Sequence, residues 1–298
     1  MAILTVRQAL LIVNPASRWG RRSQDAVVRA CADAGIDATV RTTQGPGDAA
    51  RTAAAHDGRY DAVFALGGDG TLSEVAGVLA GTRIAVAILP AGTGNLAARA
   101  LGIPLTPAAA VLALVHGERR RIDVARMDDG RCMVFAAGVG IDAAMIAGAT
   151  LARKRRWGVL TYFVTGTLAA FQRPEFEVHA TVDGVSIRCK AWAVFVANFG
   201  RVLGGLIHLG PDIHPDDGAL DLCVLSPESL LGACGVAWRL IRNDFRPHPC
   251  MQFVKGRVIE LTTVPPRPLQ FDGEMAGQTQ ARFCIEPGAL SILVPASR

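Results

Sequence analysis

The first part of the chain alternates short apolar runs with amphipathic helical patterns, and this alternation restricts the fold more than any other feature. The apolar runs lie at Ala9–Val13, Ala38–Thr43, Tyr60–Leu66 and Arg83–Pro90. Between them, segments such as Arg21–Gly35 place apolar residues at helical spacing. Strands that alternate with helices pair in parallel and carry helices on both faces. We therefore predict a three-layer α/β domain with a parallel sheet over residues 1–122.

Beyond residue 122 the pattern changes to short alternating segments separated by turn signals. Asp-Gly pairs at Asp129–Gly130, Asp183–Gly184 and Asp272–Gly273 lie between such segments, and Asp-Gly is a strong hairpin signal. Helical patterns near residues 144–172 and 227–241 interrupt the strands. The region from 123 to 287 is therefore predicted to be mainly antiparallel, with helical inserts.

Composition agrees with two domains. The chain has 298 residues and a hydrophobic content of 50%, enough for more than one core. A net charge of +5 weakly favours acidic partners such as nucleotide phosphates or an anionic membrane. Its seven cysteines are scattered and form no C-x-x-C pair, so neither a disulfide framework nor a zinc site is expected. We expect a cytoplasmic protein.

Three loops between a strand and a helix have the composition of anion-binding loops. They are Asn14–Arg22 (NPASRWGRR), Gly67–Thr71 (GGDGT) and Ala91–Asn95 (AGTGN). Glycine lets backbone N–H groups approach an anion, and the following helix start adds partial positive charge. Thr71 and Glu74 have the spacing of a capping box, which predicts a helix start directly after the glycines.

Asp69 is the unexpected member of the second loop, because a carboxylate repels phosphate unless a cation lies between them. We therefore interpret Asp69 as facing Mg²⁺ bound to a nucleotide. The spacing of neither a P-loop nor a Rossmann fingerprint is present. The alternative for GGDGT is a strained turn that only ends a strand.

Several motifs together resemble the diacylglycerol kinase catalytic family, which includes bacterial lipid kinases and sphingosine kinases. They are NPAS, GGDGTLSEV, LPAGTGNLAARALGIP, the DDG of HPDDGALDL, and FDGE. The resemblance covers nearly the whole chain, although NAD kinases and phosphofructokinases also use GGDGT. It implies a nucleotide-binding α/β domain, a C-terminal β-sandwich domain that binds the lipid, and a cleft where ATP meets a lipid hydroxyl. It also implies that residues 288–298 pack onto the first domain.

The resemblance assigns roles to individual residues. Nucleotide contacts fall on Asn14, Pro15, Ala16, Ser17, Arg18, Thr43, Gly67, Gly68, Asp69, Gly70, Thr71, Leu72, Ser73 and Thr93. Glu274 of FDGE becomes the general base and, with Asp69, a catalytic residue. The side chain of Asp217 and the backbone carbonyls of His214 and Ala219 are expected to hold a Mg²⁺. On composition alone, a solvated hairpin tip is the favoured interpretation of Glu274, and an ordinary turn is as good an interpretation of Asp217 as a metal ligand.

This chain departs from the family pattern at three positions. Arg18 stands where glycine is usual, and Ser73 replaces a common asparagine. Leu96 stands where many members have an aspartate linked to the aspartates at positions 69 and 123. The leucine is expected to break that three-carboxylate network and to leave Asp69 and Asp123 as its remaining members.

The predicted function is an ATP- and Mg²⁺-dependent lipid kinase that acts on diacylglycerol or a related lipid at the inner face of the membrane. Arg153–Trp157 is a basic cluster suited to anionic lipid, or else a solvated helix start. We expect no transmembrane span and no nucleic-acid partner, and a homodimer remains open. The alternatives are a kinase of a soluble substrate such as NAD, and a non-catalytic nucleotide- or lipid-binding module.

Overall fold

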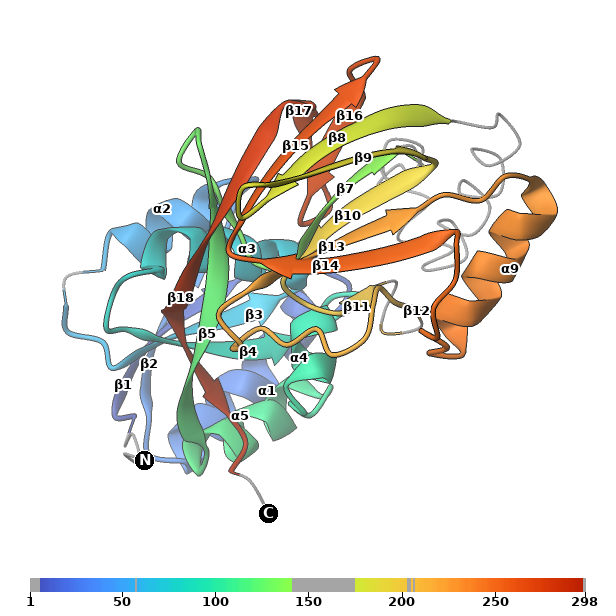
Figure 1. Cartoon of the computed structure of the whole chain (residues 1–298). Helices are drawn as coiled ribbons and strands as arrows, with labels where there is room; N and C mark the ends of the chain where they lie inside the picture. The colour runs from blue at the N-terminus through green and yellow to red at the C-terminus, as the bar shows by residue number, and fades with distance from the viewer. Residues whose placement is uncertain (1–5, 57, 141–174, 203–204, 206, 297–298) are drawn as a thin grey trace. The chain divides into compact units, whose positions relative to one another are not determined.

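The computed structural model describes residues 6–56, 58–140, 175–202, 205 and 207–296 (Figure 1). The chain separates into two compact units. The first contains Met1–Ile122 and Gly288–Arg298, and the second contains Asp123–Pro287. The helical pattern at 144–172 and the basic cluster Arg153–Trp157 lie outside the described residues.

A parallel sheet forms the centre of the first unit. Its strands β1 (Gln8–Val13), β2 (Asp37–Thr42), β3 (Ala62–Gly67) and β4 (Ala85–Pro90) lie in the order β2-β1-β3-β4. All residues of β3 and β4 are buried, as expected for strands covered on both faces. The end of β18 (Ala281–Val294) joins beside β4, where Ile292 pairs with Val86 in parallel. The predicted parallel sheet is confirmed.

Helices cover both faces of this sheet. They are α1 (Gly20–Asp33), α2 (Asp48–Ala54), α3 (Asp69–Leu79), α4 (Leu96–Ala100) and α5 (Pro107–Val115). Because the strand order reverses after β2, right-handed crossovers put α1 on one face and α2 and α3 on the other. The contacts agree, since α1 packs against α5 and α2 against α3. Helix α5 was not predicted from the sequence, because its nearly continuous apolar run gives little helical periodicity.

The second unit is an antiparallel β-sandwich, which confirms the predicted fold class. One sheet has the order β14-β13-β10-β7-β16-β17, and the other contains β18-β15-β8-β9 with β5 and β6 attached. The strands are β5 (Glu118–Met127), β6 (Cys132–Met133), β7 (Ala136–Gly140), β8 (Phe176–Val182), β9 (Val185–Ala191), β10 (Ala193–Ala197), β13 (Leu220–Leu225), β14 (Met251–Gly256), β15 (Val258–Val264), β16 (Pro268–Phe271) and β17 (Glu274–Gln278). Side chains from both sheets, including Val194, Leu222, Ile259 and Phe283, share one buried core.

Smaller elements complete the second unit. The strands β11 (Arg201–Val202) and β12 (Ile207–His208) form a two-stranded ribbon. Helix α9 (Leu230–Ile241) contacts β12 and begins after Ser229, whose hydroxyl accepts the N–H of Gly232 at 3.1 Å (Figure 1). This helix confirms the pattern seen at residues 227–241.

Two segments that read as continuous strands cross from one sheet of the sandwich to the other. The residues after Asp183–Gly184 divide into β9 and β10, and Met251–Val264 divides into β14 and β15. The second crossing occurs at Gly256, where a Cβ would overlap the side chain of Val182. The Asp183 carboxylate fixes this corner by accepting the N–H of Val258 at 2.8 Å. Alternating hydrophobicity runs through both crossings and therefore hides them.

Candidate functional site

The glycine loops after β3 and β4 lie against each other at the carboxyl edge of the sheet. Gly67 pairs with Pro90 at the end of the two strands, and the N–H of Ala91 donates to the Gly67 carbonyl at 2.7 Å. A Cβ added to Gly92 would lie 2.6 Å from the Cα of Gly68. Only glycine allows the two backbones to approach so closely. The expectation that these loops lie together is confirmed.

The loop after β1 joins them through Asn14. Its N–H donates to the Leu66 carbonyl at 2.9 Å, and its Nδ2 donates to Thr71 Oγ1 at 2.9 Å. Further along the same loop, the N–H of Trp19 donates to the Ala91 carbonyl at 2.9 Å. All three predicted loops therefore gather at one edge of the sheet, as the sequence predicted.

The start of α3 differs from the prediction, because Thr71 and Glu74 do not form a capping box. The helix already begins at Asp69, and no side chain caps its N-terminus. Thr71 instead accepts a hydrogen bond from Asn14, while Glu74 Oε2 accepts the N–H of Ala49 at 3.1 Å, at the start of α2. Both side chains thus hold neighbouring elements together, and the first-turn N–H groups of α3 keep their partial positive charge.

Asp69 has a structural partner within the first unit. Its Oδ1 accepts the N–H of Leu96 at 2.7 Å and the N–H of Ala97 at 3.4 Å, and so caps α4. Leu96 therefore remains connected to Asp69 through its backbone, although its side chain has no carboxylate. Position 96 therefore contacts Asp69 through a backbone N–H group and supplies no third carboxylate, so the expectation that Asp69 and Asp123 are the remaining members of the network stays a prediction.

The other predicted nucleotide contacts differ in how accessible they are. The side chain of Leu72 is buried in the core, at 2% exposure, so only its backbone can face a ligand. Thr43 is also buried, whereas Thr93 is exposed. Arg18 is exposed and stacks over the Trp19 ring at 5.5 Å. The close approach in this loop falls at Gly20, where a Cβ would overlap the Asn14 carbonyl and Ser17 Oγ.

In the second unit, Asp123 organises the loop that contains the DDG motif. Its Oδ2 accepts the N–H of Gly218 at 2.7 Å, and its own N–H donates to the Pro215 carbonyl at 2.6 Å. Asn198 is fully buried and donates from Nδ2 to the carbonyls of Asp123 and Val134, at 2.9 and 2.8 Å. The sequence analysis missed Asn198, whose single amide at the end of an apolar strand gives no recognisable motif.

One of the residues assigned to Mg²⁺, Asp217, contacts a lysine. Asp217 Oδ1 accepts the N–H of Ala219 at 3.1 Å, and its Oδ2 lies 2.5 Å from Lys255 Nζ. The ammonium also approaches Asp221, where burial raises the carboxyl pKa to about 6 and the lysine opposes that shift. Among the described residues, no group of three histidine, cysteine, aspartate or glutamate side chains is arranged to hold a metal. Lys255 was not predicted from the sequence, because it lies far from the DDG motif along the chain.

Glu274 follows a tight turn between β16 and β17, as predicted. Asp272 and Gly273 occupy the turn with φ values of 49° and 88°. The Asp272 carboxylate accepts the N–H groups of Val134 and Phe135, each at 2.8 Å, and thereby fixes the base of the hairpin. Glu274 is exposed at the start of β17. The Asp272 carboxylate therefore anchors the turn, and the Glu274 side chain that follows it is exposed.

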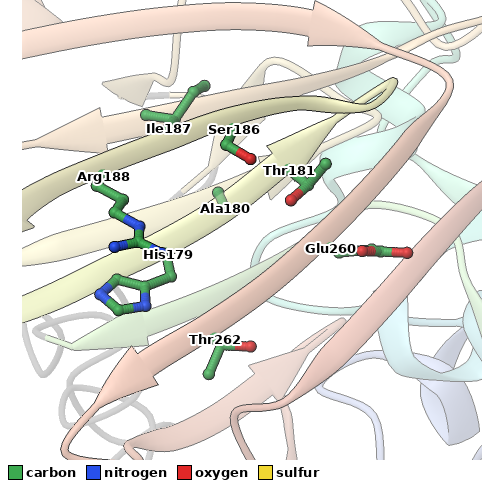
Figure 2. A pocket seen from close by; sticks show the side chains of 8 residues that line it. All are labelled: His179, Ala180, Thr181, Ser186, Ile187, Arg188, Glu260 and Thr262. Atoms are coloured by element: carbon green, nitrogen blue, oxygen red, sulfur yellow. The ribbon is translucent and has the colours of Figure 1, made fainter.

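A shallow polar hollow lies on β8, β9 and β15 of the second unit (Figure 2). Its lining includes His179, Arg188 and Glu260. None of the predicted site residues lines it, so it is separate from the predicted chemistry.

Comparisons with known proteins agree with the motifs. The family model of the diacylglycerol kinase catalytic domain matches residues 8–127, and that of the YegS C-terminal NAD kinase beta sandwich-like domain matches residues 135–294. A probable lipid kinase YegS-like from Pseudomonas aeruginosa strain PAO1 is 35% identical over 97% of this chain and 95% of its own length. The chain belongs to the diacylglycerol kinase catalytic family.

Two further proteins are similar to this chain. An uncharacterized protein, sll0036 of Synechocystis, is 32% identical over 80% of this chain, which spans only 56% of that longer protein. The crystal structure of a "putative diacylglycerol kinase" from Bacillus anthracis superposes with a TM-score of 0.85 at 26% identity, covering 98% of this chain and 97% of that one.

The glycine loops have backbone features that suit an anionic ligand. The contact between Gly68 and Gly92 leaves no room for a Cβ, so the loop backbones are held at the sheet edge. The N-terminus of α3 adds a partial positive charge beside them. The kinase family thus implies ATP and usually a divalent metal. Among the described residues, no helix is both long and apolar enough to cross a membrane.

Proposed function

We propose that the protein transfers the γ-phosphoryl group of ATP–Mg²⁺ to a hydroxyl of diacylglycerol or a related lipid. The observation that carries this proposal is the convergence of the three loops after β1, β3 and β4, held by the contacts of Gly92 with Gly68 and of Asn14 with Thr71. In this proposal the first unit, 1–122 with 288–298, binds the nucleotide, and the second, 123–287, binds the lipid.

Phosphoryl transfer requires placement, charge neutralisation and removal of a proton from the attacking alcohol. The backbone N–H groups at the start of α3 and the exposed side chain of Arg18 supply positive charge for the phosphates. Mg²⁺ bound to ATP would supply further charge neutralisation for the transferred group, with Asp69 as the residue expected to face it. Glu274 accepts the proton of the lipid hydroxyl, and the anchored turn at Asp272 holds it in place.

The direct test incubates the protein with labelled ATP, MgCl₂ and a panel of lipid alcohols in mixed micelles, with NAD in a parallel reaction. We expect a labelled lipid product that disappears in Glu274→Gln. Glu260→Gln is the matched control, because Glu260 is an exposed carboxylate of the same unit whose pairing with Arg282 contributes little. Labelled NAD without labelled lipid would favour a kinase of soluble substrates, and nucleotide binding with no labelled product would favour a non-catalytic module.

Helix α9 supports an acceptor that resides in a membrane. Leu231 and Trp238 on one stripe of this helix are 83% and 59% exposed. Arg242 continues the stripe and stacks on Trp238 at 5.6 Å, and α9 itself contains no acidic residue. Tryptophan favours the membrane interface, and arginine favours anionic lipid. We therefore assign α9 to the face that contacts an anionic bilayer.

Vesicle flotation tests this assignment. Phosphatidylcholine vesicles with added phosphatidylglycerol should bind the wild-type protein, and a Leu231→Glu/Trp238→Glu variant should bind about tenfold less, since two exposed apolar groups no longer enter the bilayer. Val185→Glu is the control, because Val185 is an equally exposed apolar residue, at 67%, outside α9. Unchanged binding of the double variant would overturn the assignment. Self-association that this variant abolishes would assign the face to a second copy instead.

A further inference from the structure

The ammonium of Lys255 is surrounded by oxygen atoms of the loop that contains the DDG motif. Its Nζ lies 3.0 Å from the Asp212 carbonyl, 2.5 Å from Asp217 Oδ2 and 3.5 Å from Asp221 Oδ2. A backbone carbonyl and two carboxylates are the ligand types that hard divalent cations prefer. The lysine therefore occupies the kind of oxygen environment that a metal ion would occupy.

The position of the lysine is fixed by the fold. Lys255 in β14 lies directly opposite Asp221 in β13 in the antiparallel register of the sheet. Residues opposite each other in such a pair project from the same face, and opposite charges there stabilise the pairing. Asp221 is only 5% exposed. A carboxylate so buried requires a positive partner, and the register supplies one from the neighbouring strand.

Two further polar groups of the loop have partners without an ion. Asp217 Oδ1 accepts the N–H of Ala219, and the N–H of Gly218 donates to Asp123. A divalent ion on Asp217 would lie within a few ångströms of the ammonium, and like charges so close repel strongly. Asp217 is the only charged member of the expected ligand set of His214, Asp217 and Ala219. This set therefore does not fit a metal while Lys255 is present.

We propose that Lys255 is a built-in cation that holds the 212–221 loop in place of the divalent ion that the family resemblance assigned to it. The loop keeps its conformation at any Mg²⁺ concentration, and the nucleotide brings the metal that the protein requires. The inference concerns the folded second unit and does not depend on kinase activity. Its failure would therefore leave the proposed function standing.

The test measures the melting temperature of the nucleotide-free full chain after chelation, with and without 5 mM MgCl₂ or CaCl₂. The wild-type melting temperature should not respond to either ion. In Lys255→Met, which keeps the length of the side chain but loses its charge, it should fall by roughly 5–10 °C and recover at least partly when the ions are added. Lys255→Arg, which retains the charge, should behave like the wild type.

The Lys255→Met/Asp217→Asn double variant locates the recovered ion. It should lose the response to Mg²⁺ and Ca²⁺, because the Asp217 carboxylate, which would bind the ion once the lysine ammonium is absent, has been removed. A Lys255→Met variant that melts like the wild type, or one that no ion restores, would overturn the proposal. If Lys255→Met does not fold, the wild type decides: a Mg²⁺ response that Asp217→Asn abolishes contradicts the proposal, and the absence of any response supports it.

Discussion

The predicted site residues of the two units are held in place by opposite means. In the first unit, the loops after β3 and β4 are positioned by glycine backbones in contact, and Gly68 and Gly92 leave no space for a side chain. In the second unit, the turns are positioned by aspartates: Asp272 accepts backbone N–H groups of residues 134 and 135, and Asp123 accepts that of Gly218.

The difference follows from what each region must offer a ligand. Contact between glycines positions the loops without a side chain that caps α3, and the partial positive charge of this helix start suits a polyanion. In the second unit the aspartate side chains accept backbone N–H groups, so fewer N–H donors remain there for a ligand. This arrangement suits a region that would present a carboxylate such as Glu274. In the proposed mechanism, the first unit offers donors and the second an acceptor, and transfer of a phosphoryl group to an alcohol requires both.

The largest effect is expected from Glu274→Gln. Loss of the general base should lower the rate of lipid phosphorylation by about 100- to 10,000-fold. Because Glu274 is exposed, its replacement should leave the melting temperature unchanged. Labelled-lipid assays and thermal unfolding check the two expectations together. If Glu274→Gln retained more than half of the wild-type activity, Glu274 would not be the proton acceptor, and the proposed difference between the two units would fail.

Gly92→Ala tests the glycine side. The new Cβ would lie 2.6 Å from the Cα of Gly68, so the loops must separate. We expect a loss of about 1–3 kcal/mol in the free energy of unfolding, together with weaker nucleotide binding. Gly70→Ala is the matched control for stability, since its Cβ would meet no atom within 4 Å. Equal stability of the two variants would show that the close approach is not required.

Asp272→Asn tests the aspartate side. Asparagine retains one acceptor oxygen, but its amide cannot accept the N–H of the second backbone group. The free energy of unfolding should fall by about 1–2 kcal/mol, and phosphorylation should slow because the Glu274 turn is loosened. Asp128→Asn serves as the control, because Asp128 is exposed and its Arg282 contact is 3.8 Å long. Denaturant titration of both variants would reveal whether the anchor is specific.

Asp69→Asn is expected to change stability least. It distinguishes a role of Asp69 as a hydrogen-bond acceptor from a role of its negative charge. Asparagine Oδ1 can still accept the Leu96 N–H, so the free energy of unfolding should change by less than about 1 kcal/mol. The rate should nevertheless fall about tenfold if the negative charge acts on nucleotide-bound Mg²⁺, equivalent to about 1.4 kcal/mol. An unchanged rate would reduce Asp69 to a cap of α4.

Much of the fold could be predicted because local patterns carry it. The strand and helix alternation predicted β1 to β4 with their helices, and the Asp-Gly pairs predicted hairpins such as the turn before Glu274. The sheet crossing at Gly256 could not be predicted, because it depends on the approach of Val182 from a distant strand. Helix α5 was missed because burial makes its sequence apolar almost throughout.

The site shows the same limit. Motif reading predicted that the three loops meet, because each follows a strand of one parallel sheet. It assigned Thr71 and Glu74 to each other through their spacing, yet each bonds to another element, Asn14 and Ala49 respectively. The role of Lys255 depends on strand register, and that of Asn198 depends on burial. Neither property can be predicted from the neighbouring residues in the sequence.

The final strand has a consequence for how the chain is made. The first unit includes Gly288–Arg298, and β4, which already pairs with β3, has its second neighbouring strand only when Ile292 is in place. During synthesis the whole of residues 123–287 leaves the ribosome before that partner strand exists. Until then the β4 edge of the nascent sheet is unpaired. A truncation before residue 290 would leave this edge unpaired permanently.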